Sequence, residues 1–171
     1  MKSLVILIGI LILTGCANKT FKDQFEDEKT WAERATQLPT YPDTRSLLEF
    51  DVSGGAITDN QYLIDPASIS VGEDGVIRFT LVVKSSSGAL NISYEGIRCS
   101  TTERKLYALG RDDKTWAQPR VSEWEKLTLV RQFFAQRELA KNIFCPNRQI
   151  VRNNEDAIRA LKSGYHPSMP R

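Results

Sequence analysis

Alternation of apolar and polar side chains is the clearest pattern in this chain, and it predicts a β-hairpin near the middle. In the segment 76–84 every second residue is apolar, at Ile77, Phe79, Leu81 and Val83. A period of two is typical of a strand with one apolar face. The turn Gly72-Glu73-Asp74-Gly75 precedes this strand, and Ser85-Ser86-Ser87-Gly88 follows it as a four-residue hairpin loop. The loop length predicts that Lys84 pairs with Ala89.

That pairing sets one register for the whole hairpin. On one face Val83 would meet Leu90, Leu81 would meet Ile92, Phe79 would meet Tyr94 and Ile77 would meet Gly96; on the other face Thr80 would meet Ser93 and Arg78 would meet Glu95. A slip by one residue would set the apolar side chains against polar partners. We therefore expect the register to be well specified.

Further strands are predicted on both sides of this hairpin. The runs 104–110, 47–52 and 61–64 are rich in residues that favour strands, and Asp112-Asp113-Lys114 predicts a turn before Trp116. The sequence therefore predicts an antiparallel sheet of about five strands, in which the hairpin 76–84/89–99 is central.

The C-terminal third changes to a helical period. Its apolar residues fall in one sector of a helical projection, at Leu129, Val130, Phe133, Phe134, Ala140, Ile143 and Phe144. Asn153 predicts the N-cap of a second helix, and Gly164 follows its end. A short helix is also expected at 30–37. Packing of the C-terminal helices on the sheet would give an α+β domain.

The N-terminus has a different pattern. Behind Lys2, an apolar run of ten residues begins at Leu4, and Leu13-Thr14-Gly15-Cys16 closes it. A membrane span needs about 20 apolar residues, so this run is typical of a secretory signal. The closing residues resemble the lipobox of bacterial lipoproteins, in which the cysteine takes a diacylglycerol and becomes the new N-terminus. We therefore expect a signal peptide at 1–15, lipidation of Cys16, a flexible tether over 16–29 and a single domain over 30–171.

The residue after Cys16 bears on location. It is Ala17 rather than aspartate, which resembles the outer-membrane sorting of lipoproteins in double-membraned bacteria. The expected location is the periplasmic face of the outer membrane, to which the acyl chains would hold the protein.

Cysteine usage agrees with export. The chain has 3 cysteines, and lipidation of Cys16 would leave Cys99 and Cys145 as a pair. In an oxidising compartment two such thiols usually form a disulfide.

Charge is nearly balanced overall but uneven along the chain. Without Lys2, 22 basic residues face 21 acidic residues, which makes nucleic acid an unfavourable partner. Residues 17–117 carry a net charge of −4 and residues 118–171 a net charge of +5. Either the two parts pack together with complementary charge, or the C-terminal part turns a basic face toward lipid phosphates or anionic cell-wall polymers.

Several motifs in order resemble one family. They are Ser70-Val71-Gly72-Glu73-Asp74-Gly75-Val76, Tyr94-Glu95-Gly96-Ile97-Arg98-Cys99, Leu106-Tyr107-Ala108-Leu109-Gly110-Arg111, the surroundings of Trp116 and Trp124, and Phe144-Cys145-Pro146. Over about residues 31–167 the chain resembles the cryptic neisserial protein-like family of exported bacterial proteins. The resemblance implies an exported single domain and assigns no catalytic residue.

Reactive groups are sparse. A cysteine nucleophile would have to combine Cys99 or Cys145 with His166, the only histidine, and a disulfide is the favoured alternative. A zinc site from the same residues lacks a close ligand pair. The acidic pairs 73–74 and 112–113 favour turns over acid/base chemistry. We therefore expect no catalytic residue, no metal and no cofactor.

Four residues are candidates for binding, namely Arg98, Arg137, Trp116 and Trp124. Each arginine adjoins an apolar face, where a guanidinium must be paired or exposed at a groove. The alternative for the arginines is a structural ion pair with an acid such as Glu95 or Glu125. The alternative for the tryptophans is core or rim packing.

The functional expectation is a non-enzymatic binding or interaction module of the cell envelope, monomeric, with an envelope protein or a cell-wall polymer as partner. The alternative is an envelope hydrolase that acts on cell-wall material and whose scattered site residues leave no motif. A deep pocket lined by titrating groups would favour the hydrolase.

Overall fold

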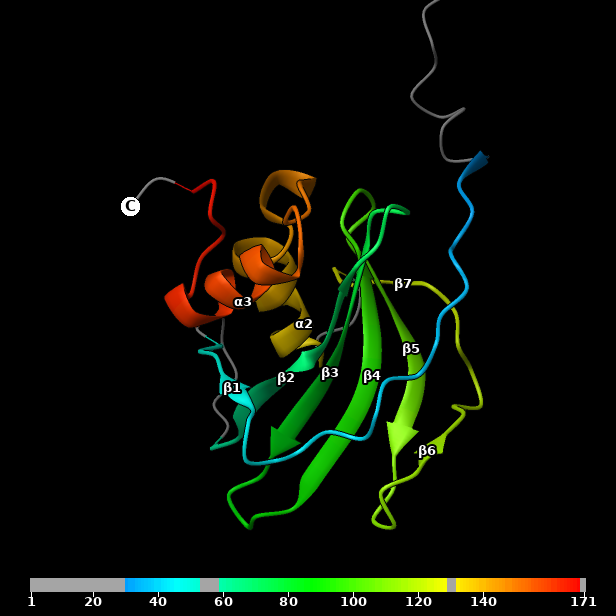
Figure 1. Ribbon diagram of the computed structural model, residues 1–171, viewed down its shortest axis with the longest axis vertical. Helices are drawn as coiled ribbons and strands as arrows, with labels where there is room; N and C mark the ends of the chain where they lie inside the picture. The colour runs from blue at the N-terminus through cyan, green and yellow to red at the C-terminus, as the bar shows by residue number, and fades with distance from the viewer. Residues whose placement is uncertain (1–29, 53–58, 129–131, 170–171) are drawn as a thin grey trace, which may run out of the picture. The chain divides into compact units, whose positions relative to one another are not determined.

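The computed structural model describes residues 30–52, 59–128 and 132–169, so the expected signal peptide, Cys16 and most of the tether lie outside the described residues. The compact unit from Ala32 onward contains an antiparallel sheet (Figure 1). Its strands are β1 (Leu48–Glu49), β2 (Gln61–Val71), β3 (Val76–Lys84), β4 (Leu90–Arg98), β5 (Glu103–Gly110), β6 (Trp116–Ala117) and β7 (Glu125–Lys126). They lie in the order β1-β2-β3-β4-β5-β6, and β7 also pairs with β5.

The predicted α+β architecture is confirmed, and the meander β3-β4-β5 is at its centre. Of the seven strands among the described residues, four are long and three have two residues each. The run 47–52 contributes only the short β1, whereas the run 61–64 extends to Val71 in β2. A register shift between Asp65 and Ser70 interrupts the pairing of β2 with β3, which is typical of a β-bulge.

Helical segments cover one face of this sheet (Figure 1). They are α2 (Phe134–Glu138), the π-helical turn η1 (Leu139–Ile143), the 3-10 turn η2 (Pro146–Arg148) and α3 (Asn154–Ser163). The predicted first helix is shorter than its apolar pattern, because α2 begins after Phe133. Leu129 and Val130 of that pattern lie outside the described residues. None of the described helices is long and apolar enough to cross a membrane.

The ends of α3 confirm the predicted capping residues. The Asn153 side chain accepts a hydrogen bond from the backbone N–H of Asp156 at 2.8 Å. Gly164 ends the helix with φ at 77°, a left-handed conformation that glycine adopts without a Cβ clash.

The central strand β3 is buried on both faces. Ile77, Phe79 and Leu81 belong to the core beneath the helices, where the rings of Phe79 and Phe144 lie 5.5 Å apart. On the opposite face Val76 and the other intervening residues up to position 82 are buried as well. The sheet therefore needs a cover on the side away from the helices.

The predicted register of the hairpin β3–β4 is wrong by one residue. Lys84 pairs with Leu90 rather than Ala89, so the loop has five residues, 85–89, closed by a hydrogen bond from Ser85 N–H to Ala89 O at 2.9 Å. Arg78 consequently pairs with Gly96, and Glu95 lies opposite Phe79 on the helix-covered face. Because both faces of β3 are buried, matching apolar residues to apolar residues does not select one register. The predicted register depended on that matching.

The helix predicted at 30–37 is also wrong, because residues 31–43 form neither helix nor strand. We call residues 33–41 the strap. The strap runs across β5, β4 and β3 on the face away from the helices (Figure 1). Hydrogen bonds from sheet side chains to the strap replace the hydrogen bonds that a helix would make within itself.

The predicted disulfide between Cys99 and Cys145 is present, with the two Cα atoms 5.2 Å apart. Cys99 follows the end of β4, and Cys145 precedes η2. Both cysteines are buried. The bond therefore fixes the helical layer to the sheet.

Replacement of both Cys99 and Cys145 by alanine should lower the free energy of unfolding by about 2–4 kcal/mol, because the bond closes a loop across a sequence separation of 46 residues. The measurement is urea unfolding of the chain from Ala17 onward, followed by circular dichroism. Chemical reduction of the unsubstituted chain should reproduce the effect. Equal stability of the oxidised and reduced chains would contradict this prediction.

Candidate functional site

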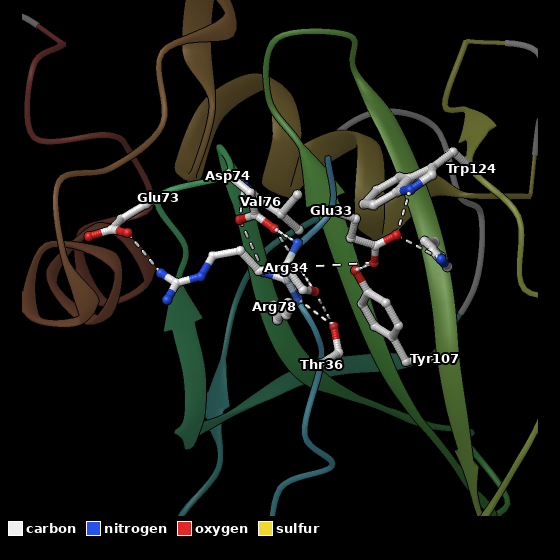
Figure 2. Close-up of polar contacts among 10 residues, drawn as sticks. Glu33, Arg34, Thr36, Glu73, Asp74, Val76, Arg78, Tyr107 and Trp124 are labelled. Carbon is white, nitrogen blue, oxygen red and sulfur yellow. Dashed lines mark hydrogen bonds and ion pairs between the residues drawn. The ribbon is translucent and has the colours of Figure 1, made fainter. Parts of the chain in front are cut away.

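Glu33 of the strap accepts hydrogen bonds from three side chains outside the strap (Figure 2). Its Oε1 accepts a hydrogen bond from the hydroxyl of Tyr107 at 2.7 Å. Its Oε2 accepts from Lys105 Nζ at 2.8 Å and from Trp124 Nε1 at 3.1 Å. One terminal nitrogen of Arg78 lies 3.9 Å from Oε1. A single carboxylate thus joins the strap to β3, β5 and the segment before β7.

A buried ion pair holds the next part of the strap (Figure 2). The side chains of Arg78 and Asp74 are only 6% and 2% exposed, and their two contacts measure 2.7 and 3.3 Å. Arg78 also donates from Nε to Thr36 Oγ1 at 2.9 Å and from a terminal nitrogen to the Arg34 carbonyl at 3.3 Å. Asp74 accepts the Arg34 backbone N–H at 2.9 Å. The pair therefore binds the strap through its backbone as well as its side chains.

Aromatic rings fill the space between the strap and the sheet. The row consists of Tyr41 and Trp116 at 5.3 Å between centroids, Trp116 and Tyr94 at 6.3 Å, Tyr94 and Tyr107 at 5.7 Å, and Tyr107 and Trp124 at 6.5 Å. Trp116 donates from Nε1 to the Pro39 carbonyl at 2.9 Å, and the Tyr41 hydroxyl donates to the Arg111 carbonyl at 2.8 Å. Each ring at an end of the row has a polar partner, as is usual for buried tyrosine and tryptophan.

The sequence of β4 makes room for Tyr107. A Cβ at Gly96 would lie 2.8 Å from Cε2 of the Tyr107 ring, closer than side chains approach one another. A register shift between Tyr94 and Glu95 leaves Tyr107 unpaired in β5. Glycine at 96 and this irregularity together let the tyrosine lie against the sheet and reach Glu33.

Electrostatics fix the protonation states of the network. Burial acts to raise the pKa of Glu33, but the hydrogen bonds from Lys105, Tyr107 and Trp124 and the charge of Lys105 together lower it. The pKa of Asp74 is lowered in the same way, since the hydrogen bonds and charge of Arg78 and the backbone N–H groups of Arg34 and Val76 together outweigh burial. Burial, and then the bond to Glu33, raise the pKa of Tyr107. Glu33 is thus ionised and Tyr107 protonated at neutral pH, and the hydrogen bond between them joins the strap to β5.

The four candidate binding residues do not form one site. Trp116 and Trp124 both lie half-buried at the strap and use their indole N–H groups there. Arg98 lies at the end of β4, 3.9 Å from Glu103. Arg137 lies on α2, with its guanidinium 4.9 Å from the centroid of a phenylalanine ring of the same helix.

Sequence reasoning did not identify a second polar cluster, on the helix-covered face. Glu95 is buried and accepts hydrogen bonds from Arg104 Nε at 3.1 Å and Gln136 Nε2 at 2.9 Å. Arg104 also lies 3.4 Å from Glu125. The two acids considered as partners for Arg98 or for an arginine of the helix are therefore both paired with Arg104. The only sequence signal was an arginine and a glutamate within neighbouring apolar strands.

The groups considered for nucleophilic and metal chemistry are placed apart or already bonded. Cys99 and Cys145 are joined to each other. His166 is buried, and its Nδ1 lies 2.7 Å from Ser168 Oγ. Among the described residues, no three histidine, cysteine or acidic side chains come together as a metal site.

The fold and the strap define a disulfide-linked α+β domain whose N-terminal segment is bound across its own sheet. The chain belongs to the CNP1-like family, whose model matches residues 26–162. It is 28% identical over 163 residues to Cryptic neisserial protein 1 of Neisseria gonorrhoeae (strain ATCC 700825 / FA 1090), with 82% of this chain and 77% of that protein covered. No solved structure matches the chain. The resemblance found in the sequence motifs is thereby confirmed.

Replacement of Glu33 by glutamine should lower the free energy of unfolding by about 1–3 kcal/mol, because it removes the charge that Lys105 and Arg78 face and leaves one donor in the network without its acceptor. The measurement is urea unfolding at pH 7. The matched control is Glu73→Gln, since the Glu73 side chain is 89% exposed and its ion pair with Arg34 should contribute little.

The pH dependence of stability follows from the direction in which the pKa of Glu33 is shifted. The pKa of Glu33 is lower in the folded state than its ordinary value of 4.5, so the stability that it contributes is present above pH 4.5 and is lost as the pH falls through the folded pKa. The difference in stability between the unsubstituted chain and Glu33→Gln should therefore shrink in that range. A difference that is constant down to pH 2, or as small as that of the Glu73 control at pH 7, would contradict the proposed role of Glu33.

Proposed function

We propose that this protein is an exported lipoprotein, held at the periplasmic face of the outer membrane by acyl chains on Cys16, and that its domain is a non-enzymatic binding module of the cell envelope. The observation that carries the proposal is the bond between Cys99 and Cys145, since it accounts for two of the 3 cysteines and leaves Cys16 for lipid. A buried disulfide is also typical of exported proteins rather than of cytosolic ones.

The way in which the strap would carry a pulling force also supports the proposal. A domain anchored through Cys16 receives any pull from the membrane through the residues that precede the strap, and the strap begins at Glu33 with contacts to β3, β5 and the segment before β7. The 16 residues between Cys16 and Glu33 that carry this pull span at most about 60 Å when fully extended. The strap would transfer the load to the sheet rather than to a single loop.

The state of the titratable groups at the strap favours binding over hydrolysis. A hydrolase needs an acid or base whose pKa lies near the working pH and which can touch substrate. Glu33 and Asp74 are instead held ionised by Lys105 and Arg78, and these contacts secure the strap. The excess of +5 in residues 118–171 favours a partner that carries negative charge, such as a cell-wall polymer or an acidic envelope protein.

Replacement of Cys16 by serine should abolish incorporation of labelled palmitate and release the protein from the membrane fraction, because each buried methylene of an acyl chain contributes about 0.8 kcal/mol to membrane binding. The measurement is metabolic labelling and fractionation of cells that express the full chain. The control is the double variant Cys99→Ala, Cys145→Ala, which should still incorporate the label. Retention of label and membrane association by the Cys16 variant would contradict lipidation.

Incubation with purified cell-wall sacculi tests the class of function. As a binding module, the chain should release no soluble fragments from the sacculi, while a muramidase in a parallel sample does. The measurement is chromatography of the supernatant. Release of fragments by this chain would instead establish the hydrolase, and sedimentation of intact chain with the sacculi would identify the polymer as the partner.

A further inference from the structure

A pocket of about 730 Å³ lies between the segment after the disulfide, the start of α3 and the C-terminal residues of the domain. Its lining residues are Arg148, Gln149, Ile150, Arg152, Asp156, His166, Pro167 and Ser168. None of them belongs to the strap network or to the polar cluster around Glu95. The pocket brings together the only histidine of the chain and two arginines from its basic third.

The histidine in this pocket has one nitrogen without a hydrogen-bond partner. His166 is 6% exposed, and its Nδ1 accepts the backbone N–H of Ser168 at 3.1 Å. This bond assigns the proton of the neutral ring to Nε2. Nε2 is buried and has no hydrogen-bond partner among the described residues. A buried donor left unsatisfied destabilises the protein, so a ligand oxygen that accepts this proton would be stabilising.

The charges at the pocket are not balanced. Asp156 is paired with both Arg152, at 2.7 Å, and Arg159, so this one acid faces two cations. Arg152 uses only Nε for that pair and is 80% exposed, which leaves its terminal nitrogens without a partner in the described chain. The guanidinium of Arg148 likewise has no ion-pair partner in residues 30–52, 59–128 and 132–169. Arg148, Arg152 and Asp156 are the charged residues that line the pocket, so its lining has a net charge of +1.

The pKa of the histidine is shifted by the same surroundings. Burial lowers the pKa of His166, and the positive charge of Arg152 lowers it further. The imidazole is therefore neutral at pH 7 and acts as a hydrogen-bond donor, while the arginines supply the charge.

Both Asn147 and Arg148 adopt positive φ, at 54° and 63°, an uncommon conformation for residues other than glycine.

We propose that this pocket binds a phosphate group, with Arg148 and the terminal nitrogens of Arg152 contacting its charged oxygens and His166 Nε2 donating a hydrogen bond to another. Guanidinium groups bind phosphate through paired, charge-assisted hydrogen bonds, and a tetrahedral anion offers oxygens in several directions at once. The phosphate could belong to a soluble phosphate ester or to a lipid headgroup, since both present the same oxygens. The site goes beyond the proposed function and does not depend on lipidation of Cys16.

The test uses the single histidine as its reporter. The full chain, free of any added histidine tag and labelled with ¹³C at Cε1 of histidine, is titrated at pH 7 and constant ionic strength. One arm uses inorganic phosphate, and the other uses glycerophosphoglycerol, the water-soluble headgroup of phosphatidylglycerol. The His166 signal should shift and saturate in at least one arm. Tighter binding of inorganic phosphate would identify a phosphate ester as the source, and tighter binding of the diester would identify a lipid headgroup.

Two arginine variants with the same change in charge distinguish binding at the pocket from general electrostatic attraction to the protein. Arg148→Gln should raise the dissociation constant about tenfold, the loss expected for one charge-assisted hydrogen bond. Arg120→Gln removes an exposed arginine outside the pocket and should change the constant less than twofold. Arg148→Lys keeps the charge without the planar fork and should fall between them. A shift that never saturates in either arm, or equal weakening by the Arg148→Gln and Arg120→Gln variants, would overturn the proposal.

Discussion

The buried ion pair between Arg78 and Asp74 is the interaction on which the strapped face of the sheet depends. Removing two charges from water costs several kcal/mol per ion, and only good geometry with further hydrogen bonds offsets that cost. Thr36 and the backbone of Arg34 supply those further bonds, and both belong to the strap. The strap thus supplies the hydrogen-bond partners that the buried ion pair needs. With those partners in place, β3 can be buried on both faces.

The parts of the fold that were predictable are those specified by residues close together in the sequence. The N-cap Asn153 contacts a residue three positions away, and the hairpin strands and the turn at 72–75 have their signals within them. The disulfide was predictable for a different reason, because the expected lipidation of Cys16 left only Cys99 and Cys145 to pair. The predicted hairpin register is wrong by one residue because it rested on a four-residue loop and on apolar matching between the strands. A five-residue loop has no signature in Ser85-Ser86-Ser87-Gly88-Ala89, and burial of both faces of β3 makes the matching ambiguous.

The strap could not be predicted, because its contacts join residues that are far apart in the chain. Thr36 and Arg78 are separated by 42 residues, and Glu33 and Trp124 by 91. The local sequence at 30–37 favours a helix. In a helix, however, the backbone groups of this segment would bond to one another, and Asp74 and Arg78 would lose their hydrogen bonds to it. Tertiary hydrogen bonds outweighed helix propensity, which amounts to a few tenths of a kcal/mol per residue. Trp116 and Trp124 were identified as residues of interest from their type alone, and the structure gives them indole partners on this strap.

The uneven charge of the chain can now be assigned to particular residues. Complementary packing of an acidic part on a basic part would require many ion pairs between them, yet across the described residues the pairs that join residues before 118 to residues after it are Arg104–Glu125 and Lys126–Glu103. The acids of the strap face are neutralised by Arg78 and Lys105, which lie in the same part of the chain. Within the C-terminal third, Arg148 and Arg152 line the same pocket as the buried His166. Positive charge at such a pocket is a physical basis for attracting an anionic partner.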